Sequence, residues 1–398
     1  MIRFILFDDP QIRQQLLPFT YTRPVSLIRC GIMTIAEKWQ EYLKQTVSYL
    51  TVDYLQPKFP PVSGPDNWYI NGSLLPDEEL VNTIMKIPLE TALLDENGQL
   101  IAFHSKKTLT DPNKLPDGSP HYTYTGQLSQ INHVWDIFLL NPQQIRDDFE
   151  KLTLRRKSFP LTDPHTICYN SADIFIEEGA QIKAAVLNAE NGPIYIGKNA
   201  QISEGALIQG PFALNEGAVV AQGAKIRPGT SVGPYCKVGG EINNAVFFGF
   251  SNKGHDGYLG NAVLGEWCNL GANTNNSNLK NDITPVSIYN YTSQKLESTG
   301  LTFCGLFMGD YSKAGISTMF NTGTTVGVGV NVFGAGFQAK HVPSFTWGGA
   351  AEGYEPYRIE KALEVIRQTQ LQKKVEFTET DETILRHIHL LSHAVSNS

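Results

Sequence analysis

IGKNAQISEGALIQGPFALNEGAVVAQGAKIRPGTSVGPYCKV, residues 196–238, carries an aliphatic side chain at every sixth position. A small residue follows most of these positions after four residues, and Phe212 is the one large exception. The aliphatic positions are Ile196, Ile202, Ile208, Leu214, Val220, Ile226, Val232 and Val238. The small positions are Ala200, Ala206, Ala218, Ala224, Thr230 and Cys236.

A period of six fits neither an α-helix, which repeats at 3.6, nor an alternating strand, which repeats at 2. It is typical of the hexapeptide repeat of a parallel β-helix. Each hexad then supplies one short strand and one corner, with the aliphatic side chain inside the coil. The small residue fits the corner, and a preceding glycine such as Gly205 relieves the backbone there.

The repeat starts weakly at Ile176, breaks after Val238 and returns at Leu264. After a second break it resumes at Met308 and runs to Val332. A solenoid accommodates loops where they leave the coil, and long loops are often functional. We therefore predict two loops that leave the coil, at about 240–262 and 279–304.

The segments outside the repeat have a different character. IRFILF (2–7) and NWYING (67–72) are predicted strands, and MTIAEKWQEYLKQ (33–45) is a predicted amphipathic helix, so the first part is an α/β layer. Residues 162–173 have the composition of a linker. After residue 349 two helices are predicted, at 355–373 and 379–394, and Thr378 and Asp381 form a capping box for the second.

Composition narrows the class of protein. The 398 residues are 41% hydrophobic and 18% charged, with a net charge of −7, so no basic field attracts nucleic acid. The apolar N-terminal run is too short for a signal peptide, and no segment is predicted to span a membrane. The five cysteines are odd in number and form no CxxC motif. These features predict a reduced, cytoplasmic chain.

One polar cluster stands out within the apolar repeat region. FSNKGHDGYLG (250–260) combines Lys253, His255, Asp256 and Tyr258 within six residues. Together with IRPG (226–229) and NLGANTNNSNLK (269–280), it resembles the acetyltransferase domain of the bifunctional N-acetylglucosamine-1-phosphate uridylyltransferase/glucosamine-1-phosphate N-acetyltransferase family. The resemblance covers residues 196–345 and implies a left-handed β-helix.

The resemblance implies a role for each matching residue. His255 would be the general base that accepts the amine proton, and Asn278 would orient it. Arg227, Tyr258 and Asn269 would bind the sugar phosphate. The backbone N–H of Ala272 would stabilise the oxyanion next to acetyl-CoA.

The chain departs from the family at two positions that bear on the phosphate. Gly239 and Gly240 stand where the family carries a lysine pair, so Lys253 and Lys280 are the predicted replacements, each with a solvated surface lysine as the alternative. Asp256 also differs, and we interpret it as a turn cap rather than as a group that raises the pKa of His255.

The N-terminal part resembles the start of sugar-nucleotide pyrophosphorylases. LLPFTYTRPVSLIRCGIMTIAEKW (16–39) and NGSLLP (71–76) carry the resemblance, which predicts nucleotide binding by Arg23, Asn71 and Gly72, with Mg²⁺ possible. DDPQIRQQ replaces the family's glycine-rich loop, and its two acids would repel a triphosphate unless a cation intervenes. Val25 and Ser73 replace the family's lysine and metal-binding aspartate. The layout resembles an alternative, Bacteroidetes-type sugar nucleotidyltransferase branch.

The sequence thus predicts an α/β domain at 1–160, a β-helix at 161–353 and helices at 354–398. The predicted reaction is acetyl transfer from acetyl-CoA to an amino sugar 1-phosphate, with nucleotidyl transfer from UTP or dTTP in the first domain. The family implies a homotrimer whose chains share each acyl site. A nucleotidyltransferase with a purely trimerising solenoid and a non-catalytic sugar-nucleotide sensor are the alternatives. HIHLLSH (387–393) is interpreted as a helix surface, so no metal site is predicted.

Overall fold

The computed structural model describes residues 2–114 and 118–395. Its contacts divide it into two compact units, Met1–Ile28 with Met33–His133 and Arg29–Ile32 with Val134–Ser398. Helix α4 (Asp136–Thr153) falls in the second unit, because it packs on the strands of the solenoid. The domain limits at 160 and 353 stay predictions.

The first unit is built on a mixed sheet whose strand order is β2-β1-β3-β6-β5-β7. Strands β2, β1 and β3 are parallel, β6 is antiparallel to β3 and β5, and β7 is parallel to β5. Their bounds are β1 Ile2–Phe7, β2 Val47–Leu50, β3 Asp66–Asn71, β5 Thr91–Leu94, β6 Leu100–Ser105 and β7 His121–Thr123. The α/β layer and its first two predicted strands are confirmed.

Short helices and one small strand pair complete this unit. They are α1 (Pro10–Gln15), α2 (Ile35–Leu43), α3 (Glu78–Ile84), and β4 (Leu74–Leu75) with β8 (Ser129–Gln130). Helix α2 confirms the predicted amphipathic helix. Thr34 and Glu37 form its capping box, which satisfies two backbone N–H groups at its start. Trp39 is fully buried and donates through Nε1 to the carbonyl of Leu74.

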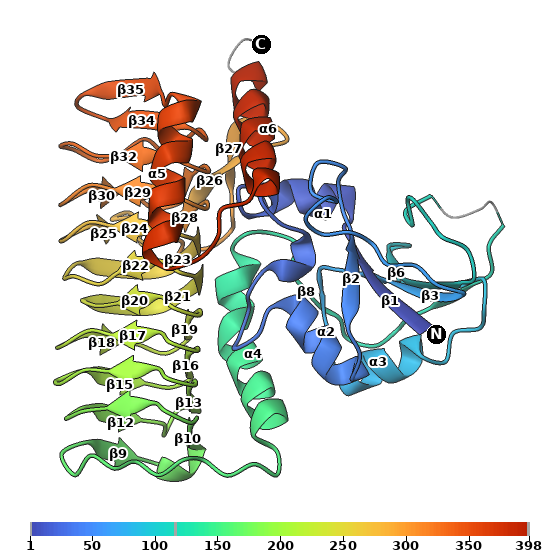
Figure 1. Cartoon of the computed structure of the whole chain (residues 1–398), viewed down its shortest axis with the longest axis horizontal. Helices are drawn as coiled ribbons and strands as arrows, with labels where there is room; N and C mark the ends of the chain where they lie inside the picture. The colour runs from blue at the N-terminus through green and yellow to red at the C-terminus, as the bar shows by residue number, and fades with distance from the viewer. Residues whose placement is uncertain (1, 115–117, 396–398) are drawn as a thin grey trace. The chain divides into compact units, whose positions relative to one another are not determined.

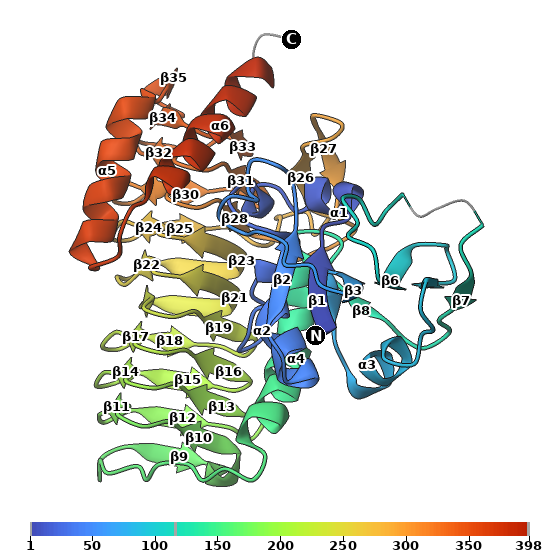
Figure 2. The same cartoon turned by 45° about the vertical axis from the view of Figure 1, so that its right-hand side comes forward.

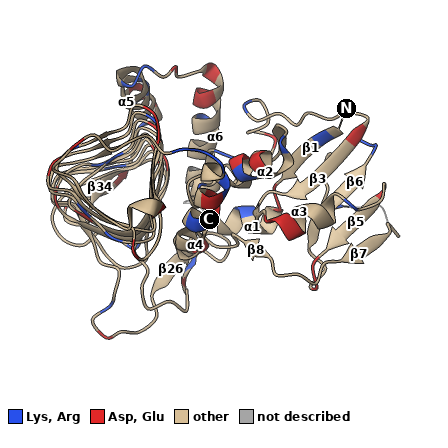
Figure 3. Ribbon diagram, turned by 90° about the horizontal axis from the view of Figure 1, so that it is seen from below, with Lys and Arg blue, Asp and Glu red and all other residues tan. Residues whose placement is uncertain are grey.

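The second unit is a parallel β-helix, whose stacked coils are seen from the side in Figures 1 and 2 and along their axis in Figure 3. Its first face contains β10 Ile174–Ile176, β13 Ile194–Ile196, β16 Phe212–Leu214, β19 Thr230–Val232, β28 Leu306–Met308, β31 Thr324–Val326 and β33 His341–Val342. Its second face contains β9 Ile167–Tyr169, β12 Val186–Asn188, β15 Leu207–Gln209, β18 Lys225–Ile226, β25 Asn275–Asn276 and β30 Met319–Phe320.

The third face of the β-helix is one sheet, and two long strands join the other faces. β21 (Glu241–Gly249) pairs with β18 through its first half and with β19 through its second, and β23 (Tyr258–Glu266) runs beside it. The third face contains β11 Gln181–Ile182, β14 Gln201–Ile202, β17 Val219–Val220, β20 Lys237–Val238, β22 Asn252–Lys253, β24 Asn269–Leu270, β29 Lys313–Ala314, β32 Asn331–Val332, β34 Thr346–Gly349 and β35 Gly353–Pro356.

The interior of the coil confirms the six-residue pattern. The eight aliphatic positions of residues 196–238 are at most 1% exposed and belong to one continuous core cluster. Phe212, the large exception among the small residues, is also fully buried. Burial of these side chains is the main free energy that holds a solenoid together, since each coil contacts only its neighbours.

The first predicted loop is wrong, because residues 240–262 remain in the coil. Val220 pairs with Val238 in the next coil, and Val238 pairs in turn with Lys253. Fewer residues separate Val238 from Lys253 than separate Val220 from Val238, so this coil is shorter. The shorter coil shifts the register and hides the six-residue period, although the strands β21, β22 and β23 continue the stack. Residues 162–173 are likewise more than a linker, because they contain β9, which pairs with β12.

The second predicted loop is confirmed. Between β25 and β28 the chain forms an antiparallel hairpin of β26 (Ser287–Asn290) and β27 (Lys295–Ser298). The coil then continues without change of stacking, since β23 pairs with β28 across the insertion.

The chain after the coil also follows the prediction, with helices α5 (Ile359–Gln372) and α6 (Glu379–Val395). Thr378 and Asp381 bond reciprocally to each other's backbone N–H, which confirms the capping box. In the part of the chain that the structure describes, no helix has the length and hydropathy of a membrane span.

Candidate functional site

His255 lies in the tight corner between β22 and β23, and its side chain is exposed. Asn252 pairs with Asn269 in the next coil, so His255 and Ala272, each three residues further on, hold equivalent corner positions in successive coils. The N–H of Asn273 donates to the carbonyl of Asp256 and holds the two corners together. Among the described residues, the N–H of Ala272 has no acceptor.

Lys253 is a charged residue in an otherwise aliphatic interior column of the third face. It pairs with Val238 in the coil before, and Leu270 follows in the coil after. Its side chain is 0% exposed, and Nζ donates to the carbonyls of His255 at 2.5 Å and Asp256 at 2.9 Å. The predicted direct contact of Lys253 with a phosphate therefore needs correction, because the ammonium faces the inside of the coil.

The glycine pair that replaces the family's lysines has a steric reason. A Cβ on Gly239 would lie 2.6 Å from the carbonyl oxygen of Gly254, and one on Gly240 would lie 2.5 Å from that of Gly257. Side chains at 239 and 240 would push the His255 corner away from the coil below it. The short coil thus depends on these two glycines.

The predicted sugar-phosphate residues Arg227 and Tyr258 both lie on the second face. Arg227 directly follows β18, and its guanidinium pairs with Glu241 at 2.8 Å. Glu241 in turn pairs in register with Tyr258 of the next coil. The Arg227 side chain is 57% exposed, so the ion pair is solvated and a stronger anion can replace Glu241.

Among the described residues, no hydrogen bond joins Asn278 to His255, and the orienting role of Asn278 stays a prediction. Its amide nitrogen donates instead to the hydroxyl of Tyr258 at 3.0 Å and to Oδ1 of Asn261 at 2.8 Å. Asn243 donates to the same hydroxyl at 3.5 Å. Asn278 therefore positions the phenol of Tyr258, and any effect on His255 passes through the corner backbone.

Asn261 and Asn244, which sequence reasoning missed, extend this amide chain into helix α4. The amide of Asn244 is oriented so that its oxygen accepts from the amide nitrogen of Asn261 and its nitrogen donates to the carbonyl of Phe138 at 2.9 Å. That carbonyl lacks its usual helical partner because Pro142 has no N–H. A sequence signal exists, since Asn244, Asn261 and Asn278 recur at an equal spacing that matches the length of the local coil.

The two remaining predicted contacts lie apart from Tyr258. Asn269 is in β24 on the third face, half-buried, beside Asn252 and Lys313. Lys280 lies at the start of the insertion, where Nζ donates to the carbonyl of Pro285 at 2.6 Å and to the hydroxyl of Thr284. The ammonium of Lys280 thus serves its own loop in this structure.

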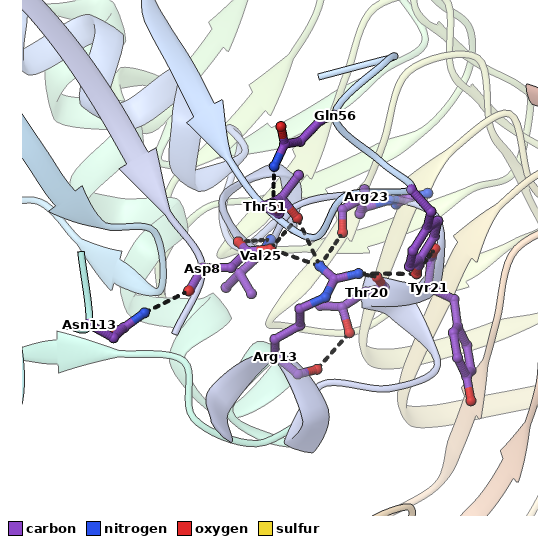
Figure 4. A network of polar contacts seen from close by, with 10 residues as sticks. Asp8, Arg13, Thr20, Tyr21, Arg23, Val25, Thr51, Gln56 and Asn113 are labelled. Carbon is purple, nitrogen blue, oxygen red and sulfur yellow. Dashed lines mark hydrogen bonds and ion pairs between the residues drawn. The ribbon is translucent and has the colours of Figure 1, made fainter. Parts of the chain in front are cut away.

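In the first unit, the segment after β1 contains a buried ion pair between Asp8 and Arg13 (Figure 4). Asp8 accepts from Arg13 at 2.8 Å, from Thr51 at 2.6 Å and from the N–H of Val25 at 2.8 Å. Arg13 therefore compensates the negative charge of Asp8, one of the two acids that were expected to repel a triphosphate. Asp9 caps α1 and takes up two of its first N–H groups.

The predicted nucleotide contacts Arg23, Asn71 and Gly72 are all buried. Ser73 donates to Oδ1 of Asn71 at 2.7 Å and accepts from Gln130 at 2.9 Å, so both polar side chains are used internally. Mg²⁺ prefers carboxylate and water oxygens. The neutral, buried side chains of Asn71 and Ser73 and the compensated Asp8 do not fit such a cation.

Comparisons with known proteins find similarity to sugar nucleotidyltransferases and to acetyltransferases. Residues 4–157 match the family described as sugar nucleotidyl transferase. The chain is 29% identical over 174 residues to the uncharacterized acetyltransferase YaiX of Escherichia coli strain 536, covering 43% of this chain and 75% of that protein. It is 34% identical over 147 residues to the bifunctional protein GlmU of Methanocaldococcus jannaschii, covering 32% of this chain and 35% of GlmU.

The predicted resemblance to sugar nucleotidyltransferases and to the bifunctional GlmU proteins is confirmed as a similarity. The chain spans about a third of the length of the GlmU protein that it matches. The polySia specific acetyltransferase NeuO is a structural neighbour at 14% identity and a TM-score of 0.29, over 53% of this chain and 98% of that one. The parallel register of the stacked strands defines the β-helix fold. The relatives support an enzyme of the acyltransferase and nucleotidyltransferase classes that acts in sugar-nucleotide chemistry.

Proposed function

We propose that the β-helix transfers an acetyl group from acetyl-CoA to the amine of an amino sugar 1-phosphate. The observation that carries this proposal is the stacking of the His255 and Ala272 corners. An exposed imidazole and a backbone N–H without an acceptor lie in successive coils, which is the pair of groups that acyl transfer needs. The acetyltransferase and GlmU relatives support the same reaction.

In this proposal the sugar amine attacks the thioester carbonyl while His255 accepts its proton. The N–H of Ala272 stabilises the negative oxygen of the tetrahedral intermediate. The C–S bond then breaks, the CoA sulfur takes the proton from His255, and the acetamido sugar leaves with its phosphate unchanged. Arg227 binds that phosphate by exchanging its ion pair with Glu241.

The phenol of Tyr258, held by Asn278, orients the sugar on the same face as Arg227. Asn269 and Lys280 are proposed as further contacts of the donor or acceptor. A homotrimer is part of the proposal, since the family shares each acyl site between chains, and a neighbouring chain would then cover the exposed His255.

The decisive assay measures CoA release from acetyl-CoA with glucosamine-1-phosphate. His255→Ala is expected to lower kcat by about 10²-fold or more, because general-base catalysis contributes on this order. His165→Ala, at an exposed histidine elsewhere in the same unit, is the matched control and keeps full activity. Equal kcat in wild type and His255→Ala would contradict the assignment, and glucose-1-phosphate, which lacks the amine, should release no CoA.

Nucleotidyl transfer by the first unit is the second candidate, favoured by the match of residues 4–157. Pyrophosphate release from UTP or dTTP with a sugar 1-phosphate tests it independently of His255. Ligand binding without pyrophosphate release would instead favour a sugar-nucleotide sensor, which the buried Asn71–Ser73 pair suits.

A further inference from the structure

Lys253 is a charged residue at a position that packing alone would fill with an aliphatic one. Its column also contains Ile182, Ile202, Val220, Val238, Leu270, Ala314 and Val332, and ends at Gly348. Removal of an ammonium from water is unfavourable, and the lost hydration is recovered only through good internal partners. Aliphatic packing along the column therefore does not account for the charge of Lys253.

The partners of the ammonium are two successive carbonyls of the corner that carries His255. Nζ donates to the carbonyl of His255 at 2.5 Å and to that of Asp256 at 2.9 Å. Hydrogen bonds from a charged donor are about twice as strong as neutral ones. Lys253 thus ties both peptide groups on the C-terminal side of the imidazole to the inside of the coil.

Backbone hydrogen bonds also hold the corner, since the N–H of Glu241 in the coil below donates to the carbonyl of Gly257, while the two glycines of that coil contribute no side chain. Gly239 and Gly240 leave room for the corner to approach the coil, as their close distances to Gly254 and Gly257 show. The N–H of Asn273 holds Asp256 from the coil above. The side chain of His255 itself has no hydrogen-bond partner among the described residues, so its orientation depends on the backbone that Lys253 holds.

We infer that Lys253 is a positioning residue for His255, which it holds from inside the coil by bonding the His255 and Asp256 carbonyls. The inference rests on the proposed function for its effect on catalysis, and on geometry for its effect on the corner. Lys253 touches no substrate. Burial lowers the pKa of Lys253 to about 8, and the carboxylate of Asp256 opposes this shift, so the ammonium keeps its proton at neutral pH.

The test compares Lys253→Met with the matched control Leu270→Met, one coil further along the same column. Met is unbranched and apolar, so it fills the column as the aliphatic members do. We expect Lys253→Met to lower kcat by about tenfold or more with KM for acetyl-CoA within about twofold, because a misplaced base slows chemistry without weakening donor binding. Its melting temperature should equal or exceed that of the wild type, and Leu270→Met should keep normal kcat.

Hydrogen exchange supplies a readout that does not depend on activity. Amides in peptides that cover residues 254–257 should exchange about tenfold faster in Lys253→Met than in the wild type, while the rest of the β-helix is unchanged. If the wild type releases no CoA, the proposed function fails, but faster exchange confined to this corner would still support the anchoring role.

Three results would overturn the inference. One is normal kcat in Lys253→Met, when the wild type is active. Another is unchanged exchange of the corner. The third is loss of folding in Lys253→Met while Leu270→Met folds, since Lys253 would then serve the stability of the coil and not the position of His255.

Discussion

At the scale of single residues, the direction of a side chain decides its chemistry. The sequence singled out Lys253 because it lies two residues from His255 in a polar stretch. Its role as a surface contact was wrong, since the coil that leads to it is shorter than the one before and turns Lys253 inward opposite Val238. Asn278 shows the same limit, because the orienting role that the resemblance implies did not predict its bond to Tyr258.

The buried Lys253 predicts an unusual dependence of stability on pH. Its pKa falls from the ordinary 10.5 to about 8 in the folded chain, so between these values the unfolded chain binds more protons. The free energy of unfolding therefore rises with pH in this window, and is lowest below pH 8. The Asp256 carboxylate is the charged group that acts on the ammonium.

Urea unfolding at pH 7 and pH 10.5 measures this effect. Lys253→Met is expected to be more stable than the wild type at pH 7, and the difference should shrink by up to about 3 kcal/mol at pH 10.5. A stability difference that is the same at both pH values would show that Lys253 keeps its ordinary pKa.

At the scale of elements, the insertion hairpin β26–β27 covers part of the coil. The ring of Tyr289 stacks on His341 of β33 at 3.6 Å, and Lys340 donates to the carbonyl of Ser287. The sequence predicted that residues 279–304 leave the coil. It did not predict that they fold back over β33, because the contact joins residues that are far apart in the chain.

This cover predicts a loss of stability in acid. Burial lowers the pKa of His341 from 6.5 to about 4, so the folded chain resists a proton that the unfolded chain accepts. The free energy of unfolding should fall as pH drops from 6.5 towards 4, by about 1–2 kcal/mol after allowance for the partial exposure of the ring. Thermal unfolding at pH 7 and 4.5 tests this prediction. The variant His341→Gln lacks the titrating imidazole, so its free energy of unfolding should fall less between these two pH values than that of the wild type.

At the scale of the whole molecule, the chain does not divide at one point. Arg29–Ile32 belong to the second unit although the residues on both sides belong to the first. The N–H of Gly31 donates to Asn141 at 2.6 Å and that of Ile32 to Asp148 at 2.8 Å. Ile32 also packs with Ile145 and Ala213 in one core cluster.

Two neighbouring substitutions should therefore act on different units. Ile28→Ala is expected to destabilise the first unit and Ile32→Ala the second, each by about 2–5 kcal/mol, since both side chains are at most 3% exposed. Calorimetry that resolves two unfolding transitions would detect a shift of a different transition in each variant. A shift of the same transition by both would contradict the division.

The sequence by itself determined the solenoid, the α/β layer, the insertion and the terminal capping box, because each depends on a local period or on residues a few positions apart. Only the tertiary structure decided that residues 240–262 stay in the coil, that Lys253 points inward and that Asn244, Asn261 and Asn278 form one amide chain. These features depend on how many residues each coil contains. That number follows from the close packing of backbone against glycine between coils, which no single repeat reveals.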